Sequence, residues 1–279
     1  GSRGDAPPES STFRFAVLGD THIIDEWYTG PENSPLDTES MWHTYDRYVA
    51  AADRIAALRK PVDFVVHVGD LIHDYVNADL DFMWANRTRM DIAVEINARM
   101  GVPLHCCFGN HDYEFSTTSR EATHEFFREK MGVPPYAAIE HRGWKFITLN
   151  CYLGQTHDPV NPRGGARNGS LGEEQLLWLE AQLADGKPTF LFVHQMLQII
   201  ETTEVRDLGL HALIKRHEGQ IRGVLAGHTH RWLALGDDYG APMQVIGATR
   251  YDADCFVVAE VDVAAGTHRF VNQQAWIPF

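Results

Sequence analysis

Five strand-like segments of this chain end on polar residues that can bind a metal ion or an anion. The motifs are GDTH (residues 19–22), GD (69–70), GNHD (109–112), VH (193–194) and GHTH (227–230). Each motif follows an apolar run typical of a buried strand. Because ligands collect at the carboxyl ends of the strands in open α/β sheets, we expect all five motifs to lie at one edge.

Helical segments separate many of these strands. Apolar residues recur at helical spacing, or helices are otherwise expected, over residues 41–59, 79–100, 172–183 and 208–217. Near the end of the chain, segments 242–249, 255–263 and 267–273 are strands without helices between them, which predicts antiparallel pairing. The pattern predicts an α/β fold with mixed sheets covered by helices.

The domain organisation is predicted to be simple. Residues 1–11 (GSRGDAPPESS) are predicted to be a disordered linker or tag remnant, and residues 12–279 a single domain. No run approaches the ~18 apolar residues of a membrane span, so we expect a soluble protein. The sequence leaves open whether the protein is cytoplasmic or is exported after removal of an upstream signal, and it leaves the oligomeric state open.

The net charge limits the classes of binding partner, and the cysteine spacing bears on metal binding. The formal net charge is −14, from 24 basic and 38 acidic residues, so the averaged surface repels nucleic acid and anionic membranes. No nucleic-acid partner is therefore expected. The four cysteines (Cys106, Cys107, Cys151 and Cys255) fit no metal-site spacing, and three of them lie in apolar segments where a thiol packs as a small hydrophobic group.

The five motifs together supply a particular set of ligands. They contain carboxylates, one amide and several imidazoles, which suit Zn²⁺, Mn²⁺ or iron, and the absence of thiolates argues against a closed structural zinc site. Each motif alone is weak, because Asp after Gly is commonly a turn or helix cap. The presence of all five motifs in this order favours one shared metal site.

This pattern resembles the calcineurin-like metallophosphoesterase superfamily, in which D-x-H, G-D, G-N-H-D/E, H and G-H-x-H follow one another. The resemblance spans Asp20 to His230 and implies a four-layer α/β/β/α sandwich of two mixed sheets flanked by helices. It also implies a dinuclear site for two divalent or trivalent ions of manganese, iron or zinc. The implied ligands are Asp20, His22 and His230 for the first ion, Asn110, His194 and His228 for the second, and Asp70 as a bridge.

A phosphoesterase reaction follows from this site. Two divalent ions, two carboxylates and a bridging hydroxide leave a formal charge of about +1, which attracts one phosphate group. We expect the bridging hydroxide to attack phosphorus directly. Asn110 and His111 are expected to contact the substrate, with His111 as the general acid or as a donor to the transition state. Asp112 is predicted to orient His111 and keep it protonated, and a simple turn residue is the alternative.

The combination of motifs resembles most the cyclic-nucleotide and glycerophosphodiester phosphodiesterase branch. A phosphodiesterase acting on a small-molecule phosphoester is therefore the main hypothesis. A broad-specificity phosphomonoesterase is the alternative, and a non-catalytic scaffold of the same fold is the third. His73 stands three residues after Asp70, where purple acid phosphatases carry a ligating tyrosine, and it argues against that branch.

Selectivity is expected to come from two loops, over residues 23–40 and 154–170. Arg163 and Arg167 are candidates to hold a second anionic group, and solvated loop arginines are the alternative. Trp27, Tyr28 and Trp42 are candidates to face a nucleobase or lipid-like group, and core packing is the alternative.

Overall fold

A computed structural model describes residues 11–75, 80–113, 118–155, 168–272 and 276–278. No helix within these ranges has the length and apolar character that a membrane span needs. The strands are β1 (Thr12–Leu18), β2 (Phe64–His67), β3 (Leu104–Cys106), β4 (Ala137–His141), β5 (Trp144–Thr148), β6 (Thr189–Phe192), β7 (Ile221–Ala226), β8 (Leu233–Ala234), β9 (Met243–Val245), β10 (Phe256–Asp262), β11 (Thr267–Phe270) and β12 (Ile277–Pro278). The helices are α1 (Pro35–Met41), α2 (Thr44–Ala56), α3 (Leu80–Ala85), α4 (Arg89–Arg99), α5 (Arg120–Met131), α7 (Glu173–Leu183) and α8 (Leu210–Arg216), with short 3₁₀ turns at Asn110–Asp112 and Leu197–Ile199.

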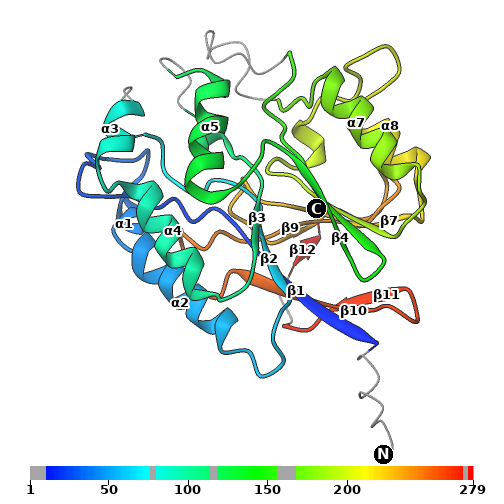
Figure 1. Cartoon of the computed structure of the whole chain (residues 1–279), viewed down its shortest axis with the longest axis horizontal. Coiled ribbons are helices and arrows are strands. Elements are labelled where there is room, and N and C mark those ends of the chain that lie inside the picture. The colour runs from blue at the N-terminus through cyan, green and yellow to red at the C-terminus, as the bar shows by residue number, and fades with distance from the viewer. Residues whose placement is uncertain (1–10, 76–79, 114–117, 156–167, 273–275, 279) are drawn as a thin grey trace, which may run out of the picture.

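The strands form two mixed sheets. The first has the order β11-β10-β1-β2-β3, and the second has the order β12-β8-β9-β7-β6-β5-β4. Strands β1, β2 and β3 run parallel to one another, and so do β5, β6, β7 and β9. Figure 1 shows α1, α2 and α4 beside the first sheet and α7 and α8 on the other side of the molecule. These layers form the four-layer sandwich that the resemblance implied.

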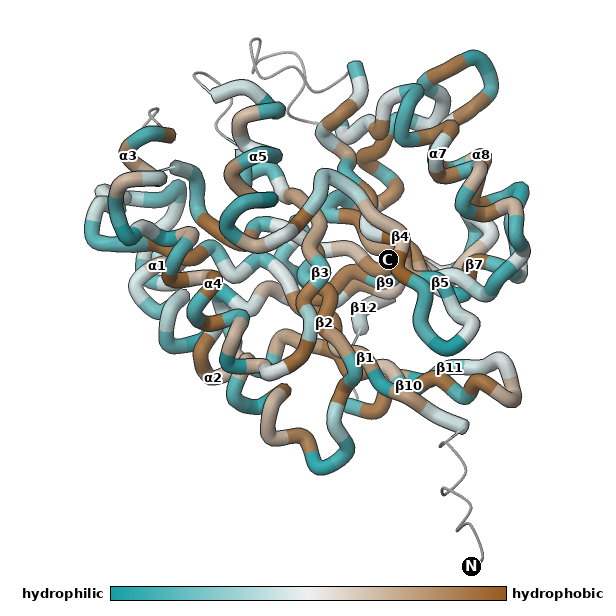
Figure 2. Tube along the Cα trace, in the orientation of Figure 1, coloured by the Kyte–Doolittle hydropathy of each residue, from teal (hydrophilic) through white to brown (hydrophobic). Residues whose placement is uncertain are grey.

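Side chains along β1 point alternately to its two faces and so pack into two different parts of the hydrophobic core. Phe15 of β1 packs edge-to-face on Phe146 and Phe190 of the second sheet, with ring centroids 5.1 and 5.2 Å apart. The neighbouring residues Ala16 and Leu18 belong instead to the core cluster that contains the buried residues of α2 and α4. Figure 2 shows the hydrophobic residues concentrated on the central strands. All four cysteines are buried free thiols, as the sequence predicted for three of them.

Two predicted helices are each interrupted. The segment 41–59 contains the end of α1 and the whole of α2, and the segment 79–100 contains α3 and α4. Before α4, Thr88 has an extended backbone (φ −110°, ψ −174°), and its N–H donates to Oδ2 of Asp91 at 2.9 Å. This N-cap begins a new helix, so one continuous helix over 79–100 was wrong.

The predicted pairing of the last strands is correct only in part. β10 pairs antiparallel with β1 and β11, but β9 pairs parallel with β7 in the other sheet. After β9 the chain crosses from the second sheet to the first. The N–H groups of Thr249 and Arg250 donate to the carbonyls of Gly19 and Asp20 at 3.1 and 3.0 Å during this crossing. Strand periodicity alone does not reveal such a change of sheet.

Candidate metal centre

The five motifs meet where the parallel strands end. The N–H of Asp20 donates to the carbonyl of Gly69 at 2.9 Å, which joins the ends of β1 and β2. The N–H of His228 lies 3.1 Å from both carboxylate oxygens of Asp20, which joins β7 of the second sheet to β1 of the first. The N–H of Gly227 donates to the carbonyl of His194 at 3.0 Å. Backbone and carboxylate contacts thus bring both sheets to one site.

The backbone at this site is unusual. Five predicted ligands have left-handed backbone, with φ of 51° at Asp20, 45° at His22, 54° at Asp70, 69° at His228 and 58° at His230. For a residue other than glycine, this conformation has an energetic cost on the order of 1–3 kcal/mol. It persists only where the surrounding structure enforces it. It turns each side chain out of strand alternation, so His228 and His230 both face the site although they are only two residues apart.

Glycines make room for the two carboxylates. A Cβ atom at Gly227 would overlap the carboxylate of Asp20, and a Cβ atom at Gly109 would overlap the carboxylate of Asp70. Close packing therefore requires glycine at both positions. Both aspartates are fully or almost fully buried.

The first ligand group consists of Asp20, His22, Asp70 and His230, whose ligand atoms all lie within 4.8 Å of one another. Nε2 of His22 lies 3.5 Å from Oδ2 of Asp70 and 3.2 Å from Nε2 of His230. Nε2 of His230 lies 3.3 Å from Oδ1 of Asp20. These are the residues predicted for the first ion and its bridge.

The second ligand group consists of Asp70, His194 and His228. Nε2 of His194 lies 3.2 Å from Oδ2 of Asp70 and 3.2 Å from Nδ1 of His228. The amide oxygen of Asn110 lies 3.0 Å from Nδ1 of His228 and 3.3 Å from Nε2 of His194. Asp70 belongs to both groups, as expected of a bridging ligand.

The chemistry of these groups fits a metal centre. Imidazole nitrogens face one another and face buried carboxylates, an arrangement that a cation stabilises and that suits borderline metals. Among the described residues, the groups contain no thiol. The Nδ1–H of His194 donates to the carbonyl of Val68 at 2.9 Å, which leaves Nε2 of His194 for the site.

The pKa values of the metal-free centre show which of its groups carry charge. Burial lowers the pKa of His22 well below its usual value, and burial followed by repulsion from His194 lowers the pKa of His228 to about 4, so both rings are neutral at neutral pH. Burial also opposes charge on Asp70 and His194. The attraction of His194 and His111 outweighs it and lowers the pKa of Asp70, and the attraction of Asp70 raises the pKa of His194 to about 9. Ionised Asp70 thus attracts positive charge at this point.

His111 lies beside the two ligand groups. Its backbone N–H donates to Oδ1 of Asp70 at 2.8 Å, and its ring Nδ1–H donates to Oδ1 of Asp74 at 2.8 Å. Burial opposes protonation of the ring, but the carboxylates of Asp70 and Asp74 outweigh it and raise the pKa of His111 to about 9. The ring is therefore protonated at neutral pH in the metal-free protein.

The predicted role of Asp112 in orienting His111 is wrong. The carboxylate of Asp112 is fully buried and accepts four backbone N–H groups. Oδ2 accepts from Asp70 and Gly109 at 2.9 and 2.8 Å, and Oδ1 accepts from Leu71 and Ile72 at 2.9 and 3.1 Å. The carboxylate thus holds the GD loop against the GNHD turn and has no acceptor left for the His111 ring.

A family model described as calcineurin-like phosphoesterase matches residues 13–232. The chain belongs to this family. A protein named as a probable cyclic nucleotide phosphodiesterase from Synechococcus is 30% identical over 143 residues, about half of each chain. Tartrate-resistant acid phosphatase type 5 from Sus scrofa is 24% identical over 255 residues, covering 85% of this chain and 70% of that protein. A solved dimetal phosphatase from Danio rerio has a TM-score of 0.62 at 17% identity, covering 88% of this chain and 92% of the other. The family and the clustered ligands support a hydrolase with a dinuclear metal site.

Three residues beside the site were missed as functional candidates or given another role. Asp74 holds the ring of His111, His73 contacts His22, and Glu32 contacts His73. The sequence held one signal for two of them, since His73 and Asp74 form a second His-Asp pair that begins three residues after Asp70. Nothing local marks Glu32, which lies about forty residues earlier in a loop.

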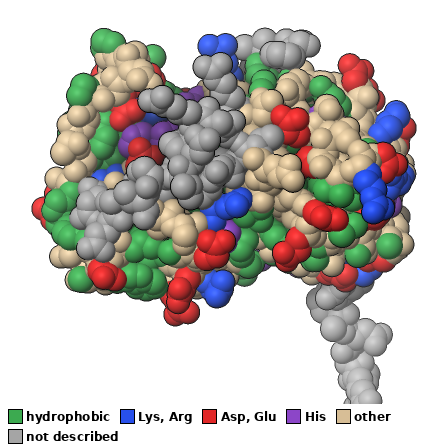
Figure 3. All heavy atoms as spheres, turned by 90° about the horizontal axis from the view of Figure 1, so that it is seen from above, with side chains coloured by type: hydrophobic (Ala, Val, Ile, Leu, Met, Phe, Trp, Pro, Cys, Tyr) green, Lys and Arg blue, Asp and Glu red, His purple; other side chains and the backbone are tan. Residues whose placement is uncertain are grey.

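The segment 23–40 borders the site, as expected, although residues 35–40 belong to α1 and are not loop. A cavity of about 240 Å³ is lined by residues of this loop, including Tyr28 and Glu32, and by His73 and Asp74. Trp42 is 60% exposed and contacts the Tyr28 ring edge-on. Trp27 packs on Phe82 instead, with ring centroids 5.1 Å apart. Figure 3 shows histidine and acidic side chains together in a hollow on the upper face of the molecule.

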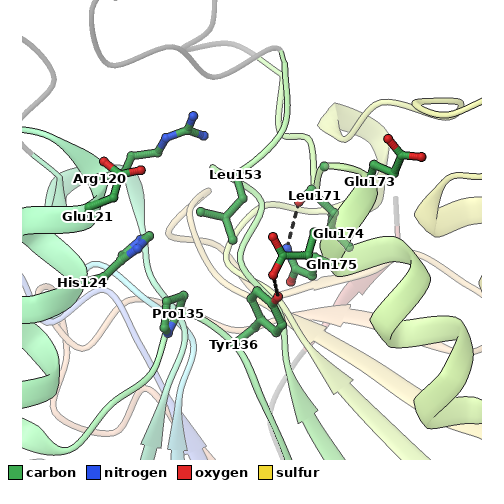
Figure 4. Close-up of a pocket in the computed structure, with 11 residues that line it drawn as sticks. Arg120, Glu121, His124, Pro135, Tyr136, Leu153, Leu171, Glu173, Glu174 and Gln175 are labelled. Carbon is green, nitrogen blue, oxygen red and sulfur yellow. Dashed lines mark hydrogen bonds between the residues drawn. The ribbon is translucent and has the colours of Figure 1, made fainter.

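The other loop, over residues 154–170, is described only at its ends, and Arg163 and Arg167 lie outside the described residues. A separate cavity of about 430 Å³ lies between the beginnings of α5 and α7, where Arg120, His124, Tyr136 and Glu174 line it (Figure 4). Its lining contains no predicted ligand.

Proposed function

We propose that this protein is a dinuclear metal-dependent phosphodiesterase that hydrolyses a small-molecule phosphodiester. The observation that carries the proposal is the position of Asp70, whose carboxylate belongs to both ligand groups. A carboxylate shared in this way supports two adjacent ions, an arrangement that recurs in phosphoester hydrolysis. The proposed ligands are Asp20, His22 and His230 for one ion and Asn110, His194 and His228 for the other, with Asp70 as the bridge.

Manganese, iron and zinc are the proposed metals, because imidazole, carboxylate and amide donors without thiolate suit these ions. When bound, two such ions supply Lewis acidity and an acidified water at neutral pH.

The residues of the chain supply binding and proton transfer. His111 is protonated, is held by Asp74 and has a side chain that is 31% exposed, so its free ring nitrogen can donate a proton to the leaving oxygen of a substrate in the cleft. The backbone N–H of His111 donates a hydrogen bond to the carboxylate of Asp70, the proposed bridging ligand, and this bond fixes the position of the His111 ring. Asn110, one residue earlier, is proposed to contact the same phosphate group.

Charge favours a diester over a monoester. A phosphodiester carries one negative charge, whereas a monoester carries nearly two at neutral pH. The formal charge of about +1 expected of the loaded centre, before the positive charge of His111 is added, is enough to hold the single negative charge of a diester. The adjacent cavity is lined by the carboxylates of Asp74 and Glu32 and by Arg89, whose charge is paired with Asp25, so this lining disfavours further negative charge. The likeness to a cyclic nucleotide phosphodiesterase supports the same choice. Phosphomonoester hydrolysis is the second candidate, supported by the likeness to an acid phosphatase over most of the chain.

The test compares hydrolysis of bis(p-nitrophenyl) phosphate and p-nitrophenyl phosphate by chelated protein with Mn²⁺, Fe²⁺ or Zn²⁺ restored. Asp70→Asn removes half of the shared carboxylate, and Asp46→Asn, an exposed residue of α2, is the matched control. We expect faster turnover of the diester, lost in Asp70→Asn and kept in Asp46→Asn. Faster monoester turnover would favour the second candidate, and no metal-dependent turnover of either substrate would refute both. Cyclic nucleotides and glycerophosphodiesters then separate the two kinds of diester.

A further inference from the structure

His73 lies buried beside the first ligand group but is not among the predicted ligands. Its Nδ1 lies 3.1 Å from Nδ1 of His22, and its Nε2 lies 3.0 Å from Oε1 of Glu32. The hydroxyl of Tyr28 donates to the same Glu32 oxygen at 2.6 Å. A continuous series of hydrogen-bonding groups therefore connects the loop 23–40 to the proposed ligand His22.

One arrangement of ring protons satisfies all of these contacts. Nε2 of His22 faces Asp70 and His230, so this nitrogen must be free of a proton to bind a cation. The proton of His22 then lies on Nδ1 and is donated to Nδ1 of His73. His73 carries its own proton on Nε2 and donates it to Glu32. An outer hydrogen bond of this kind fixes both the tautomer and the orientation of a ligating histidine.

The position of His73 is itself held from several directions. Its backbone N–H donates to the carbonyl of Ile23 at 3.1 Å, and its carbonyl accepts from the guanidinium of Arg89. Arg89 forms a buried ion pair with Asp25 at 2.9 Å. The ring of His73 stacks on His111 with centroids 4.7 Å apart and planes 19° apart. A side chain fixed in this way can impose its geometry on a neighbour.

We propose that His73 is a positioning residue for the first metal ion, fixing the ring of His22 through a hydrogen bond, and that Glu32 holds His73 in turn. The inference rests on the proposed function, because it takes His22 to be a metal ligand. It adds that the loop 23–40, which borders the cleft, governs how tightly one of the two ions is retained.

A competing arrangement makes His73 a ligand. Nitrogen atoms of His22, His73 and His111 also lie within 4.8 Å of one another. Binding of a cation there would use Nδ1 of His22 and would break its hydrogen bond to His73. That arrangement predicts a third ion, whereas positioning by His73 predicts two.

The experiment measures Mn²⁺ binding to the chelated full chain by calorimetry, with the metal content per chain as a second readout and thermal unfolding of the metal-free protein as a control. His73→Phe keeps a ring that can stack on His111 but removes both hydrogen bonds. His73→Asn places an amide oxygen near the position of Nδ1, where it can still accept from His22. Glu32→Gln removes the outer carboxylate, and Glu39→Gln, an exposed residue of α1, is its matched control.

We expect the wild-type chain to bind two ions. His73→Phe should weaken one ion by roughly 10- to 100-fold and leave the other nearly unchanged. His73→Asn should restore most of that loss, Glu32→Gln should weaken the same ion by a smaller factor, and Glu39→Gln should change nothing. If His73→Phe unfolds the metal-free protein, Glu32→Gln and His73→Asn carry the test.

Three results would overturn the inference. Unchanged binding of both ions in His73→Phe and Glu32→Gln would show that the hydrogen bonds do not position His22. Equal weakening of both ions would indicate a general structural role, and three ions in the wild type would indicate ligation by His73. Failure of the proposed function looks different, because wild type and Asp70→Asn would then both bind no ion at this centre.

Discussion

Substitution of Asp112 by asparagine tests how the loops of the site are held together. Each carboxylate oxygen of Asp112 accepts two backbone N–H groups, one oxygen from Asp70 and Gly109 and the other from Leu71 and Ile72. Asparagine has one amide oxygen and can keep only two of these bonds. Its NH₂ group must face the other two N–H donors, which are buried.

The cost follows from this count. Each buried donor left without an acceptor costs about 1–3 kcal/mol, so two donors cost roughly 2–6 kcal/mol. Burial, and then the nearby carboxylate of Asp70, raise the pKa of Asp112 to about 7, so removing its charge returns part of that cost. We expect Asp112→Asn to lower the free energy of unfolding of the metal-free protein by about 2–4 kcal/mol, a large share of the ~5–15 kcal/mol typical of a folded domain.

Urea unfolding followed by circular dichroism measures this difference, and Asp46→Asn on the exposed face of α2 is the matched control. Metal affinity should fall as well, because the N–H of Asp70 is among the donors. A loss below about 0.5 kcal/mol would refute the reasoning. Unchanged stability together with an altered pH profile of activity would return Asp112 to the originally predicted role beside His111.

Further substitutions and metal removal test other parts of the structure. Gly227→Ala should abolish metal binding, measured as metal content per chain, because its Cβ would overlap the carboxylate of Asp20; a variant that still binds two ions would contradict this. Asp74→Asn should lower the pKa of His111, measured by NMR titration of the metal-free protein, because a hydrogen-bonded carboxylate is lost. Hydrogen bonds from Lys60, Arg14 and Arg269 lower the pKa of Glu260 to about 2, below its unfolded value of 4.5, so its stabilisation is complete above about pH 4.5 and is lost as the pH falls toward 2. Glu260→Gln should therefore reduce stability by about 1 kcal/mol at pH 7 and by nearly nothing at pH 2, and an equal loss at both pH values would argue against the ion pairs. Chelation should lower the melting temperature of the wild-type chain, with recovery on addition of Mn²⁺, because ligands that bind only the folded state stabilise it.

Much of the fold could be predicted from local sequence. The apolar runs before Asp20, Asp70 and His194 correspond to β1, β2 and β6, because a buried strand leaves a continuous hydrophobic pattern. The break before α4 was also readable, since Thr88 and Asp91 form a capping pair, although the segment was predicted as one helix. The parallel pairing of β9 was not readable, because nothing in its three residues indicates which sheet they join.

The candidate site, like the fold, was predictable from the sequence only in part. The residue types and order of the five motifs identify the ligand set, because metal preference follows from the donor atoms themselves. The neighbours of those ligands depend on the direction of each side chain. Asp74 has left-handed backbone (φ 52°), which helps to set where its carboxylate meets the ring of His111, and Asp112 turns instead toward the backbone of the GD loop.

The sequence by itself determined the family, the order of the strands and helices along most of the chain, and the seven candidate ligands, since each depends on residue type and spacing. Only the tertiary structure decided that Asp74 rather than Asp112 holds His111, and that Glu32 reaches His73. These contacts join residues from separate strand ends and loops. Their geometry arises from backbone turns and packing between the two sheets, which no local pattern of residues encodes.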